Sequence, residues 1–256
     1  MDTPADPLRR TSRKTIVLSL LALFLLPIAA RAALFAYEGA PTSWRNADWS
    51  STGSLPDPGA DSQARVLIMS GRTGGWKGVF SVHSWVVLKP ENARSWRRYD
   101  VVGWGNPVRI NGWAPDGLWF GNKPQVVLDL QGAAATNAIP KIEAAIKSYN
   151  YVNAGDYRIW PGPNSNTFVA HLGREIPELR LTMPSTAIGK DFVPLDQIVG
   201  WTPSHTGVQL SLYGLVGVLA GWDEGFEVNL FGLVAGFDLR RPALKLPGIG
   251  RVPGEG

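Results

Sequence analysis

The chain contains no cysteine, which excludes disulfides and zinc–thiolate sites and restricts any nucleophile of a cysteine-hydrolase type to a hydroxyl group. Histidine is also scarce: three scattered residues give no metal-ligand set, and no nucleotide motif or cofactor is indicated. Charged residues make up only 18% of the chain. The net charge is +4, but four basic residues (Arg9, Arg10, Arg13 and Lys14) precede the first apolar run. The remainder is therefore nearly neutral, which argues against nucleic-acid binding.

Glycine, proline and tryptophan, by contrast, are abundant. The 256 residues include 29 Gly, 20 Pro and 11 Trp, a composition that favours strands and turns over long helices. Strand patterns come first, and helical patterns follow. We therefore expect an α+β fold with an antiparallel sheet and few helices.

The N-terminal residues 1–37 are expected to be a signal anchor or a signal peptide. Basic residues lead into an apolar stretch that, extended to Tyr37, would span roughly 34 Å as a helix, enough to cross a bilayer. Ala30-Arg31-Ala32 is a weak cleavage site, so we expect an uncleaved transmembrane helix. The basic residues place the N-terminus in the cytoplasm and the body outside it.

Residues 38–64 are predicted to be a linker rich in Gly and Pro, which Trp44 and Trp49 pin to the membrane interface or to the domain. A single domain is predicted from residue 65 to residue 256. Within it, the patterns predict strands at 66–69, 79–88, 96–104, 126–130 and 157–160, and a Trp/Gly loop over 107–121. An amphipathic helix is predicted over Asn137–Tyr149, and a second helix ends near Arg174.

An internal repeat marks the C-terminal third. Residues 208–218 and 226–236 match at an offset of 18 and are predicted to form a Gly-rich apolar β-hairpin over 208–236, or two short elements. A membrane-facing role remains open, but we expect this segment to pack on the domain.

Ser165 is the most informative residue. It lies within Asn-Ser-Asn-Thr, residue types that begin helices, where the helix dipole favours an anion. His83 on a predicted strand is the natural general base, and Asp100 on the next strand would orient it, with Asp129 as second choice. The predicted catalytic residues are therefore Ser165, His83 and Asp100. The predicted substrate-binding residues are Asn164, Asn166, Thr167 and Trp85.

The same residues also have a structural interpretation. A strand histidine is more often structural than catalytic, and Asn-Ser-Asn-Thr caps a helix without any catalytic duty. Serine also needs a base more than cysteine does, because its pKa lies far above neutrality.

Six runs resemble a bacterial family, the domain of unknown function 3750 family: VHSW (82–85), YDVVGWG (99–105), GPNSNTF (162–168), TAIGKDF (186–192), NLFGLV (229–234) and LRRPALK (239–245). This resemblance covers nearly everything from about residue 40 onward. It brings no established activity.

A more distant resemblance is to circularly permuted papain-like proteins, namely NlpC-type peptidases and lecithin:retinol acyltransferase-like enzymes. In that group a strand histidine precedes an Asn-Cys-x-x-Phe motif at a helix start. Here Asn164 to Phe168 match with Ser165 in the cysteine position, and His83 matches the upstream histidine. The resemblance implies a permuted papain-like fold, and the serine puts thiol chemistry out of reach.

Two functional hypotheses follow. The first is a membrane-tethered cell-envelope hydrolase or acyltransferase that acts on an amide or ester, in a peptidoglycan peptide or a lipid, with its body in the periplasm beside a bacterial inner membrane. The second is a catalytically inactive papain-like module that binds peptide or lipid. A purely structural envelope protein is a third interpretation, but it leaves the polar motif unexplained.

Overall fold

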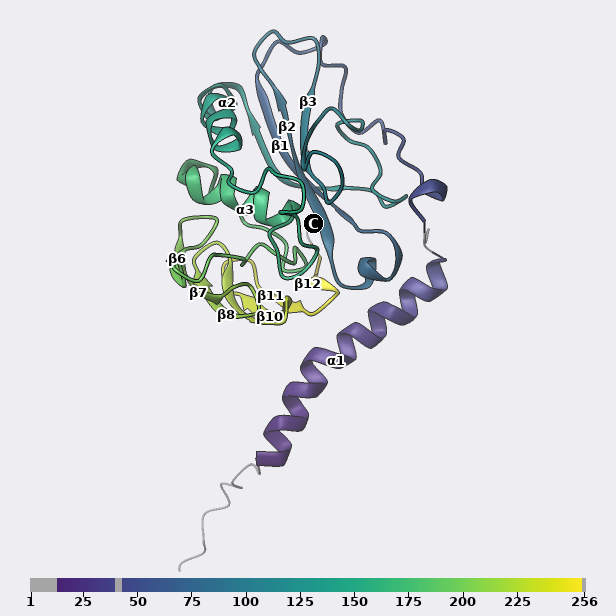
Figure 1. The fold of residues 1–256 in the computed structure, drawn as a ribbon, viewed down its shortest axis with the longest axis vertical. Helices are drawn as coiled ribbons and strands as arrows, with labels where there is room; N and C mark the ends of the chain where they lie inside the picture. The colour runs from purple at the N-terminus through teal and green to yellow at the C-terminus, as the bar shows by residue number, and fades with distance from the viewer. Residues whose placement is uncertain (1–12, 40–42, 255–256) are drawn as a thin grey trace, which may run out of the picture.

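The computed structural model describes residues 13–39 and 43–254 (Figure 1). Arg9, Arg10 and Pro41, on which the N-terminal and linker predictions partly rest, lie outside the described residues. Within them, three α-helices accompany two antiparallel sheets. The predicted α+β class is confirmed.

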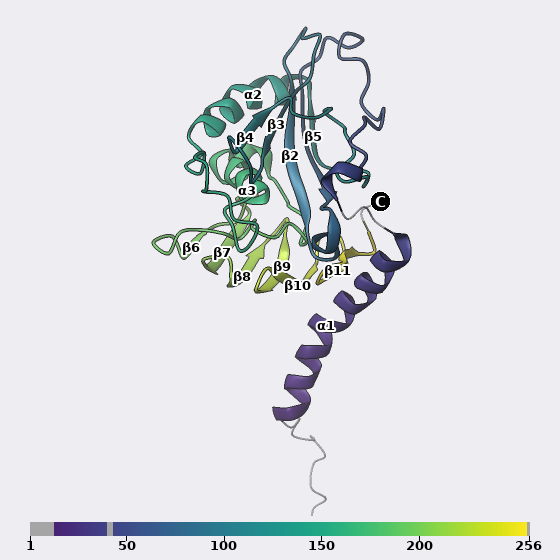
Figure 2. The ribbon, with the colours of Figure 1, turned by 45° about the vertical axis from the view of Figure 1, so that its right-hand side comes forward.

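Helix α1 (Arg13–Glu38) is long and apolar enough to cross a membrane, and only 6% of its most apolar window is buried. The helix extends away from the remainder of the chain (Figures 1 and 2). Its C-terminal half contacts the 3₁₀ helix η2 (Gly75–Val79) and two strands of the second sheet, β10 (Leu233–Asp238) and β11 (Ala243–Leu246). An apolar N-terminal helix is therefore present, as predicted.

The first sheet has the strand order β4-β3-β2-β1-β5. Its strands are β1 (Arg65–Arg72), β2 (Val82–Lys89), β3 (Arg97–Val101), β4 (Val108–Ile110) and β5 (Gln125–Gln131). Helices α2 (Gly132–Lys147) and α3 (Ser165–Glu175) pack beside this sheet (Figure 2). The predicted apolar stripe of α2, from Ile139 to Tyr149, is buried there.

The period-two alternation of β2 assigns its side chains to two separate cores. Val86 and Leu88 join α2 and α3 in the larger core, whereas Trp85 and Val87 lie on the opposite face with Trp119. Residues 44–58 cover that second face. Trp44 and Trp49 pack against each other and against aromatic rings of the domain, so in this structure they pin the predicted linker to the domain.

Several predicted elements differ in the structure. The helix predicted over 137–149 is α2 (Gly132–Lys147), and the strand predicted over 96–104 is the shorter β3 (Arg97–Val101). The strand predicted from residue 79 begins at Val82, because Phe80 and Ser81 donate their backbone N–H groups to the Lys77 carbonyl and close a turn. The predicted loop at 107–121 contains the short strand β4. Residues 157–160 form no strand, because the Asn164 side chain binds the Ile159 carbonyl and the prolines that follow lack N–H donors.

The second sheet is a seven-stranded meander, β12 to β6 in reverse chain order. Its strands are β6 (Val199–Trp201), β7 (Gly207–Leu212), β8 (Val216–Gly221), β9 (Gly225–Leu230), β10 (Leu233–Asp238), β11 (Ala243–Leu246) and β12 (Gly250–Val252). Each arm of the predicted hairpin is itself a hairpin, because Tyr213-Gly214 and Phe231-Gly232 adopt positive φ and turn the chain. The 18-residue repeat is thus a two-strand unit. The remaining 3₁₀ helices are η1 (Trp44–Asn46) and η3 (Pro177–Leu179).

Candidate active site at the start of helix α3

Helix α3 begins at Ser165, and Asn164 is its N-cap. The Asn164 Oδ1 accepts hydrogen bonds from the backbone N–H groups of Asn166 and Thr167 at 2.9 and 3.2 Å. Thr167 Oγ1 in turn accepts from the Asn164 N–H at 3.1 Å, which completes a capping box. Since the cap occupies two of the helix N–H groups, the helix start is held rigidly and Ser165 lies at its positive end.

Asn166 ties this helix start to the first sheet. Its Nδ2 donates to the carbonyls of Val82 (2.9 Å) and Ile188 (2.8 Å), and its Oδ1 accepts from Ser84 Oγ at 2.8 Å. All three partners lie in β2 or in the segment after α3. The amide therefore fixes the position of Ser165 relative to the strand that carries His83.

His83, Asp100 and Arg98 form a buried cluster on β2 and β3. His83 Nε2 lies 2.9 Å from Asp100 Oδ1, as predicted from their neighbouring strands. Arg98 donates to both carboxylate oxygens through Nε and Nη2 at 2.8 Å each. The Asp100 side chain is fully buried and that of Arg98 is 1% exposed.

The charges of this cluster fix the histidine tautomer. Burial opposes ionisation of Asp100, but hydrogen bonds and charge from His83 and Arg98 outweigh it and hold the pKa of Asp100 below its ordinary value. An ionised carboxylate only accepts hydrogen bonds, so Nε2 of His83 carries the proton. Burial also lowers the pKa of His83, against the pull of Asp100. At neutral pH the ring is therefore neutral, and Nδ1 keeps an acceptor lone pair.

Tryptophans enclose the cluster. The His83 ring stacks on Trp119 with centroids 3.7 Å apart and planes 5° apart, and the Arg98 guanidinium lies 4.0 Å from the Trp85 ring centroid. Trp85 is fully buried, and its indole N–H donates to the Pro115 carbonyl at 3.0 Å. These contacts restrict rotation of the imidazole.

His83 and Ser165 line one pocket of about 270 Å³. Within the described chain, no hydrogen bond joins Ser165 Oγ to the imidazole. Tyr157, which the sequence did not single out, lines the same pocket. Burial raises the pKa of its phenol, and hydrogen bonds with the side chain and backbone of Ser165 oppose that rise. The phenol oxygen thus lies beside the donor groups at the helix start, where an oxyanion would be stabilised.

The structure brings the predicted residues Ser165, His83, Asn164 and Asn166 to this pocket, with Asp100 directly behind His83. Thr167 lies two residues after Ser165 in α3, and its hydroxyl donates to the Gly189 carbonyl at 2.7 Å. The side-chain amides of Asn164 and Asn166 are both engaged with backbone carbonyls. Their predicted roles, and that of Trp85, in substrate binding stay predictions.

The other candidates lie elsewhere. Asp129, the second choice for orienting the histidine, forms a two-point ion pair with Arg65 instead. His171 binds the Ala145 carbonyl, and His205 binds the Arg174 carbonyl. Among residues 13–39 and 43–254, no group of three or more His, Asp or Glu side chains could hold a metal ion.

The fold and site define an α+β protein with an apolar N-terminal helix and a buried His–Asp–Arg cluster beside a serine at a helix start. A family model described as protein of unknown function (DUF3750) matches residues 63–192, about half of the chain, and the chain belongs to that family. That match spans β1 to α3 and includes every predicted site residue. No curated protein and no solved structure matches the chain. The resemblance to permuted papain-like proteins is not confirmed by these comparisons and stays a hypothesis.

Proposed function

We propose that this protein is a membrane-tethered hydrolase or acyltransferase that acts on an amide or ester, with Ser165 as nucleophile and His83 as general base. The observation that carries this proposal is the neutral His83, oriented by Asp100 through Nε2, in the wall of the pocket that Ser165 lines. A neutral imidazole with a free acceptor nitrogen is what a serine nucleophile requires.

In the proposed reaction, Ser165 Oγ attacks the carbonyl carbon while its proton passes to Nδ1 of His83. The carbonyl oxygen becomes an oxyanion, which the backbone N–H at the helix start and the Tyr157 hydroxyl stabilise. The bond to the leaving amine or alcohol then breaks, and that group takes the proton from His83. Water, or an acceptor alcohol or amine, reverses these steps on the acyl-enzyme and regenerates Ser165.

The pocket walls favour a substrate with an apolar portion. Aromatic and aliphatic side chains surround the polar end of the pocket: Trp76, Phe80, Ile159, Trp160, Ile188, Phe231 and Leu233. With α1 as a membrane anchor and basic residues on the cytoplasmic side, the body would lie in the periplasm beside the inner membrane. Lipid acyl groups and peptidoglycan peptides are the substrates such a location offers.

One observation favours a second candidate, a non-catalytic module that binds peptide or lipid. Ser165 and His83 form no hydrogen bond in the described chain, and the amides of Asn164 and Asn166 serve backbone carbonyls. Hydrogen bonds between nucleophile and base are often long before substrate binds, so this geometry is compatible with both candidates.

A fluorophosphonate probe on the detergent-solubilised full chain tests the proposal. We expect a covalent adduct on Ser165, located by mass spectrometry of the peptide, and no adduct in Ser165→Ala or His83→Gln. Ser185→Ala is the matched control, since Ser185 is buried in a different pocket and should leave labelling unchanged. If folded wild-type protein takes no label, the binding-module candidate is favoured. An adduct that persists in Ser165→Ala would contradict the proposed nucleophile.

A further inference from the structure

The second sheet carries an apolar row across all seven strands on the face turned away from α2 and α3. The register pairs Trp201 with Val208, Val208 with Ala220, Ala220 with Phe226, and so on through Phe237 and Leu244 to Val252. Paired residues share a face, so these side chains form one continuous surface. The exposed members of this outer face are Val199, Trp201, Val208, Leu210, Leu212, Val216, Val218, Phe226, Phe237, Leu244 and Val252.

The opposite face of the same sheet is polar and buried. Gln209, Glu227 and Lys245 lie on it and are at most 5% exposed. Glu227 forms ion pairs with Lys190 and Lys245, and Gln209 accepts from Arg174. The lysines hold the pKa of Glu227 below its ordinary value despite burial. In an ordinary sheet with one face in water, the apolar face packs on the domain and the polar face meets solvent. The second sheet has the opposite arrangement.

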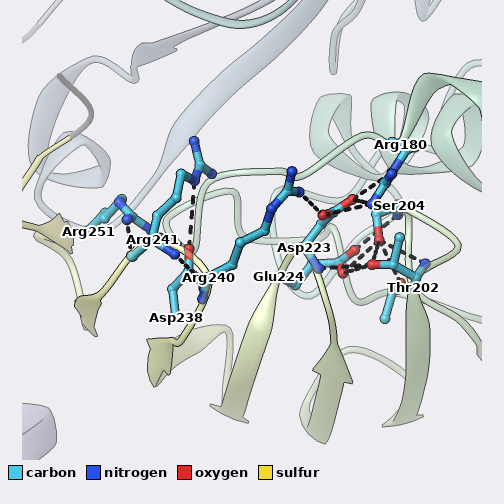
Figure 3. Close-up of polar contacts among 10 residues, drawn as sticks. Arg180, Thr202, Ser204, Asp223, Glu224, Asp238, Arg240, Arg241 and Arg251 are labelled. Atoms are coloured by element: carbon cyan, nitrogen blue, oxygen red, sulfur yellow. Dashed lines mark hydrogen bonds and ion pairs between the residues drawn. The ribbon is translucent and has the colours of Figure 1, made fainter.

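An apolar face of this extent is unusual on a surface in contact with water. Seven strands about 4.8 Å apart make a face roughly 30 Å wide, and its four strands of six residues, β7 to β10, make it roughly 20 Å long there. Such a face is at the upper limit of the apolar patches that monomers expose. Charges near this face are confined to strand ends. Figure 3 shows Asp223 bound by Arg180 and Arg240, and Asp238 bound by Arg241 and Arg251, at the turns of the sheet.

The outer face adjoins the apolar helix α1. The helix contacts β10 and β11, and Ile28 lies beside Gly248 in the turn between β11 and β12. From there α1 runs away on the side of the sheet opposite to α2 and α3 (Figures 1 and 2). Its exposed leucines continue the apolar surface beyond the sheet. Exposed aromatic rings, Trp201, Trp222 and Phe231, lie at the sheet's edge strand and turns, as aromatic residues do at the level of lipid headgroups.

We propose that the outer face of the second sheet lies on the surface of the same bilayer that α1 crosses, and that lipid covers it. The inverted pattern and the continuity with α1 carry this inference. It rests on the membrane tether in the proposed function but not on catalysis.

The absence of cysteine makes the test direct, because each introduced cysteine is the sole labelling site. The full chain is reconstituted in vesicles of phosphatidylethanolamine and phosphatidylglycerol, with a nitroxide spin label at one position. Leu210→Cys and Phe237→Cys report on the outer face. Leu21→Cys reports on α1, and Glu91→Cys, in the exposed turn after β2, is the aqueous control. Accessibility to oxygen, which concentrates in lipid, is compared with accessibility to a water-soluble nickel chelate.

We expect the oxygen-to-nickel ratio at Leu210 and Phe237 to be several-fold above that at Glu91 and close to that at Leu21. A ratio equal to that at Glu91 would overturn the inference and leave the tether intact. Shielding from both reagents would also overturn it, because a second copy or another protein would then cover the face. If Leu21 alone proved aqueous, the transmembrane anchor of the proposed function would fail, and with it the inference that the sheet lies on the bilayer that α1 crosses. Because two outer-face positions are labelled separately, the test can still be read at one of them if the other variant fails to fold.

Discussion

Asp100→Asn should destabilise the protein by about 3–5 kcal/mol, because it leaves a buried guanidinium without its counter-charge. The Arg98 side chain is 1% exposed and donates two of its hydrogen bonds to this one carboxylate. Asparagine keeps the shape but supplies one acceptor oxygen and no charge. An asparagine amide can also turn its NH₂ group towards His83, so the substitution no longer fixes the His83 tautomer.

The assay is thermal unfolding of the full chain in detergent, followed by near-ultraviolet circular dichroism of the tryptophans. At about 2–4 °C per kcal/mol for a domain of this size, Tm should fall by about 6–20 °C. Asp129→Asn is the matched control on the same sheet. It breaks a two-point Asp–Arg pair whose side chains are 25% and 31% exposed, so the cost should be at most about 1 kcal/mol.

Equal losses in the two variants would refute the reasoning, because burial would then not determine the cost. A second check is the double variant Arg98→Met with Asp100→Asn, which removes both charges. It should be no less stable than Asp100→Asn alone. A further drop in the double variant would mean that Arg98 is stabilised by the tryptophans rather than by the carboxylate.

Three other outcomes are expected. The folded-state pKa of His83 is lowered. Its contribution to stability is therefore complete above the unfolded pKa of about 6.5 and is lost as the pH falls from that value towards the folded pKa. Between pH 8 and pH 5, Tm should fall less in His83→Gln than in the wild type. Gly189→Ala should lower Tm clearly more than Gly155→Ala. Both glycines have positive φ, but only at Gly189 would the added Cβ lie 2.3 Å from the capping amide of Asn164. Equal losses of Tm would contradict the proposed clash with the Asn164 cap. Asn166→Ala should lower the free energy of unfolding by about 2 kcal/mol, because it removes three hydrogen bonds in the interior and leaves the Ser84 hydroxyl without its acceptor. The carbonyls of Ile188 and Val82 keep their donors in Asn164 and Ser81. Chemical denaturation measures this, and a loss below about 0.5 kcal/mol would contradict it.

The pairing of His83 with Asp100 could be predicted from sequence because it follows from local rules. Consecutive antiparallel strands are neighbours, and period-two alternation decides which side chains share a face. The helix start at Ser165 was equally local, since Asn and Thr three residues apart can form reciprocal caps. Each of these inferences needs only short stretches of chain.

The rest of the site depends on contacts between distant segments. Trp119 reaches His83 from an irregular loop, and Tyr157 approaches Ser165 from a segment whose pattern predicted a strand. Neither position has a periodic signal. Arg98 was within reach of sequence reasoning, because it lies two residues before Asp100 and therefore on the same face of β3.

In the second sheet, the sequence predicted the strands but not which face of the sheet packs on the domain. Alternation correctly indicated strands in the repeat, but the usual rule places apolar side chains towards the domain. Here the polar row faces inward, because Lys190 and Arg174 lie beneath it and need partners. The orientation of the sheet is decided by what it packs against, which its own sequence does not contain.

The two proposals meet at the pocket beside Ser165. Phe231 and Leu233 line its wall. Phe231 lies in the turn between β9 and β10 of the sheet that we place on the bilayer, and Leu233 is the first residue of β10. Trp76 lines the same pocket from η2, the segment that contacts α1. If lipid covers the outer face, the apolar wall of the pocket therefore lies at the bilayer surface. A substrate with an acyl chain could then enter without its apolar part crossing water, whereas a cross-linking peptide would gain nothing from these walls. Of the two substrate classes considered, the geometry favours the lipid.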